Sequence, residues 1–169
     1  MRISFPDHPE LRPSPDRVRE TLFNWLQPVV LESRCLDLFA GSGVLGIEAL
    51  SRGASEVVLV ERDAQAVRSI GDSLQRLQAT GATVLQADAL RYLDTAPVKP
   101  FNVVFLDPPY AAGLLPEVCG KLARNGWLAP SAMIYLEAPA SSTLPPLPPA
   151  WVMHRSRQAG QVGYHLLRS

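Results

Sequence analysis

The sequence predicts one α/β domain with three layers and a mainly parallel sheet. Five apolar runs alternate along the chain with segments of helical spacing, and this alternation is typical of parallel βαβ units. A glycine-rich turn follows the first apolar run, as in sheets that bind nucleotides. The 169 residues suffice for one domain and are too few for two ordinary ones, so we treat 1–169 as a single unit.

The expected strands are near-continuous apolar runs, which indicates burial on both faces of the sheet. They lie at 34–40, 56–61, 82–86, 101–106 and 132–137. The helices between them are expected at 45–51, 64–77, 89–93 and 114–122. Strand and helix therefore alternate in a doubly wound order.

A further helix is expected near the start of the chain. Ser14 suits the N-cap, Pro15 suits the first helical position, and Asp16 complements the positive end of the helix dipole. Apolar residues recur on one face of this helix, namely Val18, Leu22, Trp25 and Leu26. Pro28 is expected to end it.

The last part of the chain differs in composition. Residues 138–150 are rich in proline, which favours a stiff, extended, solvated connection over a ligand for a proline-recognising module. Strand-like runs at 151–157 and 161–168 predict an antiparallel hairpin across 151–168. Residues 138–169 contain no Asp or Glu, so they form the candidate patch for a nucleic-acid partner. Its basic side chains are His154, Arg155, Arg157, His165 and Arg168.

The overall composition excludes several classes of protein. The chain carries 16 basic and 16 acidic residues, so its net charge does not indicate a nucleic-acid partner. No window approaches the ~18 apolar residues of a membrane helix, and the first residues lack a signal-peptide pattern; we therefore expect a cytoplasmic protein. We also expect a monomer. Cys35 and Cys119 are isolated in apolar surroundings, which predicts core positions and no metal site.

The glycine-rich turn predicts a ligand of the nucleotide type. In CLDLFAGSGVLGIEAL, Gly41, Gly43 and Gly46 satisfy the pattern GxGxxG, and glycines let the backbone turn tightly and approach a ligand. Glu61 ends the next strand, where it can accept hydrogen bonds from ribose hydroxyls or be an exposed loop acid. This pattern alone fits both NAD and S-adenosylmethionine.

Asp37 favours the methyl donor over NAD. A carboxylate just before the turn attracts the charged amino group of S-adenosylmethionine and repels a pyrophosphate. Asp88 follows the third expected strand, where it can accept from the adenine amino group, cap the helix that begins at Ala89, or do both. We therefore expect S-adenosylmethionine as the cofactor.

The stretch FLDPPY ends the fourth expected strand at the edge where open α/β sheets bind ligands. Pro108 and Pro109 supply no backbone donors, so the carbonyls of Asp107 and Pro108 are expected to accept hydrogen bonds from a ligand. Such acceptors can hold the hydrogens of an exocyclic amine and aim its lone pair at a methyl donor, and Asp107 can take the released proton. Tyr110 can stack on an extruded base. The other interpretation is an ordinary proline turn.

These motifs occur together in an order that resembles the RsmD family. The resemblance covers residues 12–168 and includes LRPSPDRVRETLFNWL, CLDLFAGSGVLGIEALSRGA, DPPY, NGWLAP with IYLE, and AGQVGYHLL. It implies a Rossmann-like class I S-adenosylmethionine-dependent methyltransferase, whose seven-stranded sheet is mainly parallel with an antiparallel last strand. It further implies methylation of the exocyclic N2 amine of one guanine in 16S ribosomal RNA of the small subunit.

The resemblance also implies roles for individual residues. Asp37, Phe39, Gly41 and Gly43 are expected to shape the methionine pocket, Glu61 to hold the ribose and Asp88 to meet the adenine. Asp107, Pro108, Pro109 and Tyr110 are expected to hold the target base. Arg12 and Arg17 correspond to a stretch near the RNA, although Arg17 can equally pair with Glu20 on the helix surface. Arg155 and Arg157 join them as candidate RNA contacts because they lie in the acid-free segment.

The sequence shows one departure from the family. Family members usually carry a basic strand segment upstream of the position of Arg12, so residues 1–11 are expected to be a remnant of that arm.

Closely similar proline-aromatic centres also methylate adenine N6 in nucleic acid or glutamine amides in protein. A noncatalytic ribosome-assembly or RNA-binding module that retains the pocket is a third possibility.

Overall fold

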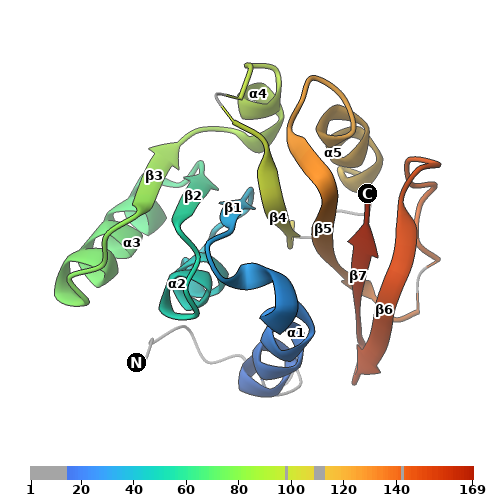
Figure 1. Cartoon of the computed structure of the whole chain (residues 1–169), viewed down its shortest axis with the longest axis horizontal. Coiled ribbons are helices and arrows are strands. Elements are labelled where there is room, and N and C mark those ends of the chain that lie inside the picture. The colour runs from blue at the N-terminus through green and yellow to red at the C-terminus, as the bar shows by residue number, and fades with distance from the viewer. Residues whose placement is uncertain (1–14, 98, 109–112, 142) are drawn as a thin grey trace.

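The computed structural model describes residues 15–97, 99–108, 113–141 and 143–169 (Figure 1). The strands are β1 Arg34–Asp37, β2 Glu56–Glu61, β3 Ala82–Gln86, β4 Phe101–Leu106, β5 Leu128–Pro139, β6 Val152–Ala159 and β7 Val162–Arg168. The helices are α1 Pro15–Val30, α2 Val44–Ser51, α3 Ala64–Arg76, α4 Ala89–Leu93 and α5 Leu115–Leu122. Their alternation confirms the predicted α/β class.

All the strands join one seven-stranded sheet in the order β3-β2-β1-β4-β5-β7-β6. The pairs β1–β2, β2–β3, β1–β4 and β4–β5 are parallel. The last strand, β7, is antiparallel to both β5 and β6, which confirms the predicted hairpin. The strand order reverses between β1 and β4, and open α/β sheets bind ligands beyond the carboxyl ends of strands at such a switch point.

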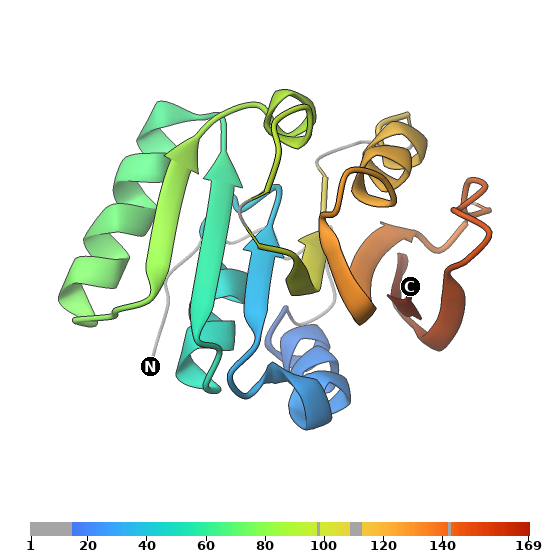
Figure 2. The same cartoon turned by 45° about the horizontal axis from the view of Figure 1, so that its top comes forward.

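Helices cover both faces of the sheet, which gives the predicted three layers (Figure 2). One buried cluster joins α1, α2 and α3 to the sheet through residues such as Leu22, Ile47 and Ile70. A second cluster joins α4 and α5 to the opposite face through Leu93 and Val118. Both cysteines are buried, as expected, and both are free thiols.

Helix α1 extends beyond its predicted end. Pro28 lies inside the helix, which continues to Val30. A proline removes the hydrogen bond to the carbonyl four residues earlier, which here belongs to Asn24. Asn24 and Pro28 are both exposed, so water can satisfy that carbonyl and the helix tolerates the proline in its last turn. Ser14, the expected N-cap, lies outside the described residues.

Two other bounds differ from the prediction. Strand β1 ends at Asp37 rather than at residue 40, because the chain turns there. The Leu38 N–H still donates to the Phe105 carbonyl at 3.3 Å, and the Ala40 N–H donates to the Val60 carbonyl at 3.0 Å. Strand β5 begins at residue 128 and continues to Pro139, so the sheet includes the first part of the proline-rich segment. The rest of that segment is not fully solvated, because Leu144 and Leu147 pack on the second cluster.

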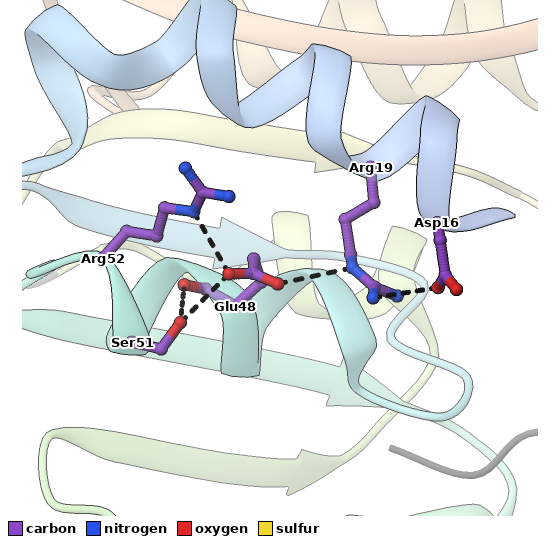
Figure 3. Close-up of polar contacts among 5 residues, drawn as sticks. All are labelled: Asp16, Arg19, Glu48, Ser51 and Arg52. Carbon is purple, nitrogen blue, oxygen red and sulfur yellow. Dashed lines mark hydrogen bonds and ion pairs between the residues drawn. The ribbon is translucent and has the colours of Figure 1, made fainter. Parts of the chain in front are cut away.

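Helix α1 is attached to both α2 and β7. Figure 3 shows Glu48 of α2 between two arginines, with its carboxylate 3.3 Å from Arg19 Nε and 3.1 Å from Arg52 Nε. Arg19 also pairs with Asp16 at 3.0 Å, so the network reaches the first turn of α1. At the other side of α1, the Trp25 ring stacks on that of Tyr164 with centroids 5.4 Å apart. These contacts hold the amino end of α1 near the edge of the sheet where the glycine turn lies.

Candidate cofactor and methyl-acceptor site

The glycine turn between β1 and α2 has the backbone that its sequence predicts. Gly41 and Gly43 have φ angles of 57° and 81°, a region that favours glycine. The Gly43 N–H donates to the Ala40 carbonyl at 2.7 Å and closes the turn. A Cβ atom placed on Gly41 would meet no atom within 4 Å, so the turn leaves open space on that side for a ligand.

Gly46 serves a different purpose from the first two glycines. It lies in α2, and a Cβ atom there would come within 2.7 Å of Leu59 Cδ2 and 3.0 Å of Val57 Cγ1. Both partners are fully buried residues of β2. The third glycine of the pattern therefore lets α2 pack closely against the sheet.

Asp37 lies buried beneath the turn, with only 2% of its surface exposed. Burial raises the pKa of its carboxyl to about 7, although the N–H groups of Gly46 and Phe39 hydrogen-bond to it and oppose this rise. The negative charge of Glu61 adds to the rise in the pKa of Asp37. A nearby cation would favour the ionised form, so this carboxyl suits a positively charged ligand group.

Glu61 connects the turn to the end of β2. Its Oε1 atom accepts from the Gly41 N–H at 2.9 Å, and its Oε2 atom accepts from the Asp63 N–H at 2.8 Å. These two bonds fix the carboxylate beside the open side of Gly41. Since each carboxylate oxygen has about two acceptor sites, each can accept a further hydrogen bond, for example from a ribose hydroxyl.

Asp88 acts as the N-cap of α4. Its Oδ2 atom accepts from the Arg91 N–H at 3.2 Å, which confirms the capping role that the sequence left open. The residue is half-buried and follows β3. The cap occupies part of the acceptor capacity of this carboxylate, so a contact with adenine is compatible with it.

Asp107 and Pro108 follow β4 at the same edge and are half-buried. The bond from the Leu38 N–H to the Phe105 carbonyl, at 3.3 Å, holds the start of the glycine turn against the end of β4. The charge of Asp107 also contributes to a raised pKa of the Tyr135 phenol. Pro109 and Tyr110, the other predicted members of this centre, lie outside the described residues.

Two further candidate residues, which the sequence did not single out, lie in the second half of β5. Tyr135 is fully buried, and its hydroxyl donates to Glu137 Oε1. Burial and the adjacent Glu137 charge raise the pKa of the Tyr135 phenol, so it stays a donor at neutral pH. The sequence offered one signal for them: Glu137 ends the apolar run IYLE, just as Asp107 follows the apolar run FNVVFL.

The candidate RNA-binding arginines lie on two elements. Arg17 is exposed on α1, and the ion pairs that α1 makes within the described chain involve Arg19 instead, so the suggested Arg17–Glu20 pair is absent there. Arg155 and Arg157 are exposed on β6, the outermost strand. Arg12 lies outside the described residues.

Two further properties concern the described residues alone. No group of three or more His, Cys, Asp or Glu side chains among them is placed to hold a metal ion. None of their helices combines the length and the apolar character that a membrane crossing requires.

Comparison with known proteins identifies the family. A family model described as "Conserved hypothetical protein 95" matches residues 1–168. The chain belongs to this family, the RsmD family. The resemblance inferred from the motifs is thereby confirmed over nearly the whole chain.

Relatives in the RsmD family carry methyltransferase names. The chain is 47% identical over 165 residues to "Ribosomal RNA small subunit methyltransferase D" of Escherichia coli, a match that covers 98% of this chain and 83% of that protein. The protein of the same name from Haemophilus influenzae is 41% identical over 162 residues, with 94% and 83% covered. A solved structure of yhhF, a methyltransferase candidate from Escherichia coli, superposes with a TM-score of 0.89 at 45% identity and covers 98% of this chain and 90% of that one.

Proposed function

We propose that this protein transfers a methyl group from S-adenosylmethionine to the exocyclic N2 amine of a guanine in 16S ribosomal RNA of the small ribosomal subunit. The observation that carries the proposal is the hydrogen bond from the Leu38 N–H, between β1 and the glycine turn, to the Phe105 carbonyl, two residues before Asp107. It brings a candidate cofactor site and a candidate amine site to adjacent strands. The names of the relatives support ribosomal RNA of the small subunit as the substrate.

The residues of the turn fit S-adenosylmethionine, which would supply the electrophilic methyl group when bound. The open side of Gly41 gives space for the methionine moiety, next to Phe39 and Gly43. Asp37 suits the ammonium group because a nearby positive charge stabilises its ionised form. Glu61 ends β2 and Asp88 follows β3, the next two strands along the sheet, and they offer acceptors to the ribose hydroxyls and the adenine amino group.

The centre after β4 would hold the amine that receives the methyl group. The lone pair of an exocyclic amine is delocalised into the base, so the nitrogen is a weak nucleophile. Acceptors from Asp107 and the Pro108 carbonyl would hold its two hydrogens and orient the lone pair, and Asp107 would take the proton released. In this proposal, Pro109 completes the turn and Tyr110 stacks on the extruded base.

Strand β6 provides the surface that would bind the RNA around the target base. Arg157 of β6 is paired with Tyr164 of β7, and Tyr164 is paired with Glu137 of β5. Glu137 follows Leu136, which is in register with Leu106 of β4. A line across the strands therefore runs from Arg157 to Asp107. Three strand spacings give about 14 Å between the two ends of this line, a span of a few nucleotides. Arg155 pairs with Leu166 on the same face, and residues 152–158 are exposed. Arg17 and Arg12 would extend this contact from α1 and the residues before it.

Transfer of a radioactive methyl group tests the proposal. Assembled small subunits from cells that lack this protein should be labelled, and digestion should give N2-methylguanosine at one position. Deproteinised 16S RNA and a release-factor-like protein serve as the other acceptors. Label on protein alone, or on adenine N6, would contradict the proposal and favour the corresponding alternative.

Replacement of Asp107 tests the proposed amine site. Asp107→Ala should lower the rate of methyl transfer at least about 100-fold, the lower end of the effect of a general base. Calorimetry should show that it leaves the affinity for S-adenosylhomocysteine largely unchanged. Unchanged transfer would refute the role of Asp107, and wild-type binding without any transfer would favour a noncatalytic module.

A further inference from the structure

Strand β5 places a second carboxylate next to the candidate amine site. Leu106 of β4 is in register with Leu136 of β5 in a parallel pair, so Asp107 and Glu137 follow at the same level of the sheet. Phe105 and Tyr135 both belong to the cluster under α1. Because side chains alternate along a strand, the residues two positions later point to the same face. Glu137 therefore lies on the α1 face, and Asp107, the first residue after β4, is close enough to that face for its charge to raise the pKa of the Tyr135 phenol.

The carboxylate of Glu137 is held in a fixed orientation. The hydroxyl of Tyr135 donates to Glu137 Oε1, and the Tyr135 side chain is fully buried and so cannot swing away. Across the part of the chain that the structure describes, Tyr135 is the one donor to this carboxylate. The Oε2 atom is therefore available to a donor on a ligand, and Glu137 itself is only half-buried.

We propose that Glu137 selects guanine as the target base by accepting a hydrogen bond from its N1–H group. This inference rests on the proposed function, in which the neighbouring Asp107 holds the N2 amine. Guanine is the standard base that presents a ring N–H directly beside an exocyclic amine. Adenine and cytosine present a ring nitrogen acceptor at that position, which the negative charge of Glu137 repels.

The spacing of the two carboxylates fits this arrangement. Neighbouring strands lie about 4.8 Å apart, and the side chains of Asp107 and Glu137 start from adjacent strands at the same level. Their carboxylates can therefore converge on the adjacent donors of one base edge. Tyr135 is a positioning residue in this scheme, because it touches the base only through Glu137.

A base analogue tests the selection directly. Small subunits are reconstituted with 16S RNA that carries either guanosine or 2-aminopurine riboside at the methylated position. 2-Aminopurine keeps the exocyclic amine but has an acceptor at N1. The wild-type protein should prefer guanosine in kcat/KM, and Glu137→Gln should shift the ratio of the two substrates toward 2-aminopurine by about 10- to 100-fold, as expected when one hydrogen bond to a base changes. The reason is that a glutamine amide can donate to that acceptor.

Tyr135→Phe is the matched control. It removes the orienting hydroxyl and should lower kcat/KM on guanosine while the preference for guanosine over 2-aminopurine persists. Calorimetry with S-adenosylhomocysteine reports whether each variant is folded. Equal losses on both substrates in Glu137→Gln would overturn the selection role and leave the proposed function standing. Absence of wild-type transfer to any guanine would overturn the proposed function, and this inference with it.

Discussion

Three carboxylates at one edge of the sheet differ in their surroundings, and these differences match the different roles proposed for them. Asp37 is buried and has a pKa raised to about 7, so its charge responds to a ligand. Glu61 accepts hydrogen bonds from two backbone N–H groups beside the turn, which fix the orientation of its carboxylate. Glu137 is oriented by one buried phenol. In the proposed function, three carboxylates would therefore bind different groups within one site: a positive charge, a ribose and a base.

The raised pKa of Asp37 predicts a pH dependence of stability. Its carboxyl changes from an ordinary pKa of 3.8 to about 7 in the folded protein. Between these values the folded state keeps a proton that the unfolded chain has released, so the free energy of unfolding falls as pH rises, by at most about 1.4 kcal/mol per pH unit. Above about pH 7 this contribution becomes constant.

Urea unfolding at pH 5, 6, 7 and 8 measures this effect. Other groups also titrate, so the informative quantity is the difference between the wild type and Asp37→Asn, which cannot ionise. This difference should move in favour of Asp37→Asn as pH rises to 7. A constant difference over the whole range would show that Asp37 is already ionised in the folded protein at pH 5.

At the scale of helices and strands, most of the architecture followed from local sequence. The bounds of β2, β3, β4 and α4 match the prediction, because strands buried on both faces require continuous apolar runs. The continuation of α1 through Pro28 was not predictable, since it depends on exposure of the Asn24 carbonyl to solvent. The role proposed for Glu137 was not predictable, because it depends on the pairing of β5 with β4, which are distant in sequence.

The packing of α2 on β2 predicts unequal effects of alanine at two glycines. Gly46→Ala should destabilise the protein by about 1–3 kcal/mol, because its Cβ would lie 2.7 Å from Leu59. Gly71→Ala should stabilise it by about 0.5–1 kcal/mol, because Gly71 lies in α3 with no atom within 4 Å of a Cβ.

Thermal and urea unfolding of the two variants provide this comparison. Both changes add the same methyl group to a helix, so the sign of the difference reports the surroundings alone. A Gly46→Ala protein as stable as the wild type would show that Leu59 and Val57 can move aside.

At the scale of the whole molecule, exposed positive charge lies on β6, the strand at one edge of the sheet. The net formal charge is zero, yet residues 138–169 contain no acid and place Arg155 and Arg157 on the outermost strand. An edge strand with exposed arginines is also protected against pairing with another sheet. The same side chains can thus favour RNA contact and discourage aggregation.

Reversal of these two charges should weaken binding to the small subunit. Arg155→Glu with Arg157→Glu is expected to raise Kd at least about 10-fold. The slope of log K against log salt concentration should become shallower by about 1 for each of the two arginines that binds a phosphate in the wild type. Affinity for S-adenosylhomocysteine should not change. Filter binding over a range of salt concentrations measures both Kd and the slope.

The control for this experiment is Arg68→Glu. Arg68 is likewise exposed but lies on α3, which packs near β3 at the opposite end of the sheet order. Arg68→Glu should leave the Kd for the small subunit nearly unchanged. Equal weakening by Arg68→Glu would show that β6 is not the docking surface.

The position of β7 affects the order in which the protein can be completed during synthesis. β7 follows β6 in the chain, yet it lies between β5 and β6 in the sheet. As the chain leaves the ribosome, β6 has no strand to join until β7 has emerged, and β5 exposes an unpaired edge that is prone to aggregation in the meantime. Trp25 is synthesised early, but its ring cannot stack on that of Tyr164 until β7 has been made. A nascent chain therefore completes the packing of α1 through Trp25 only after the final hairpin has been translated.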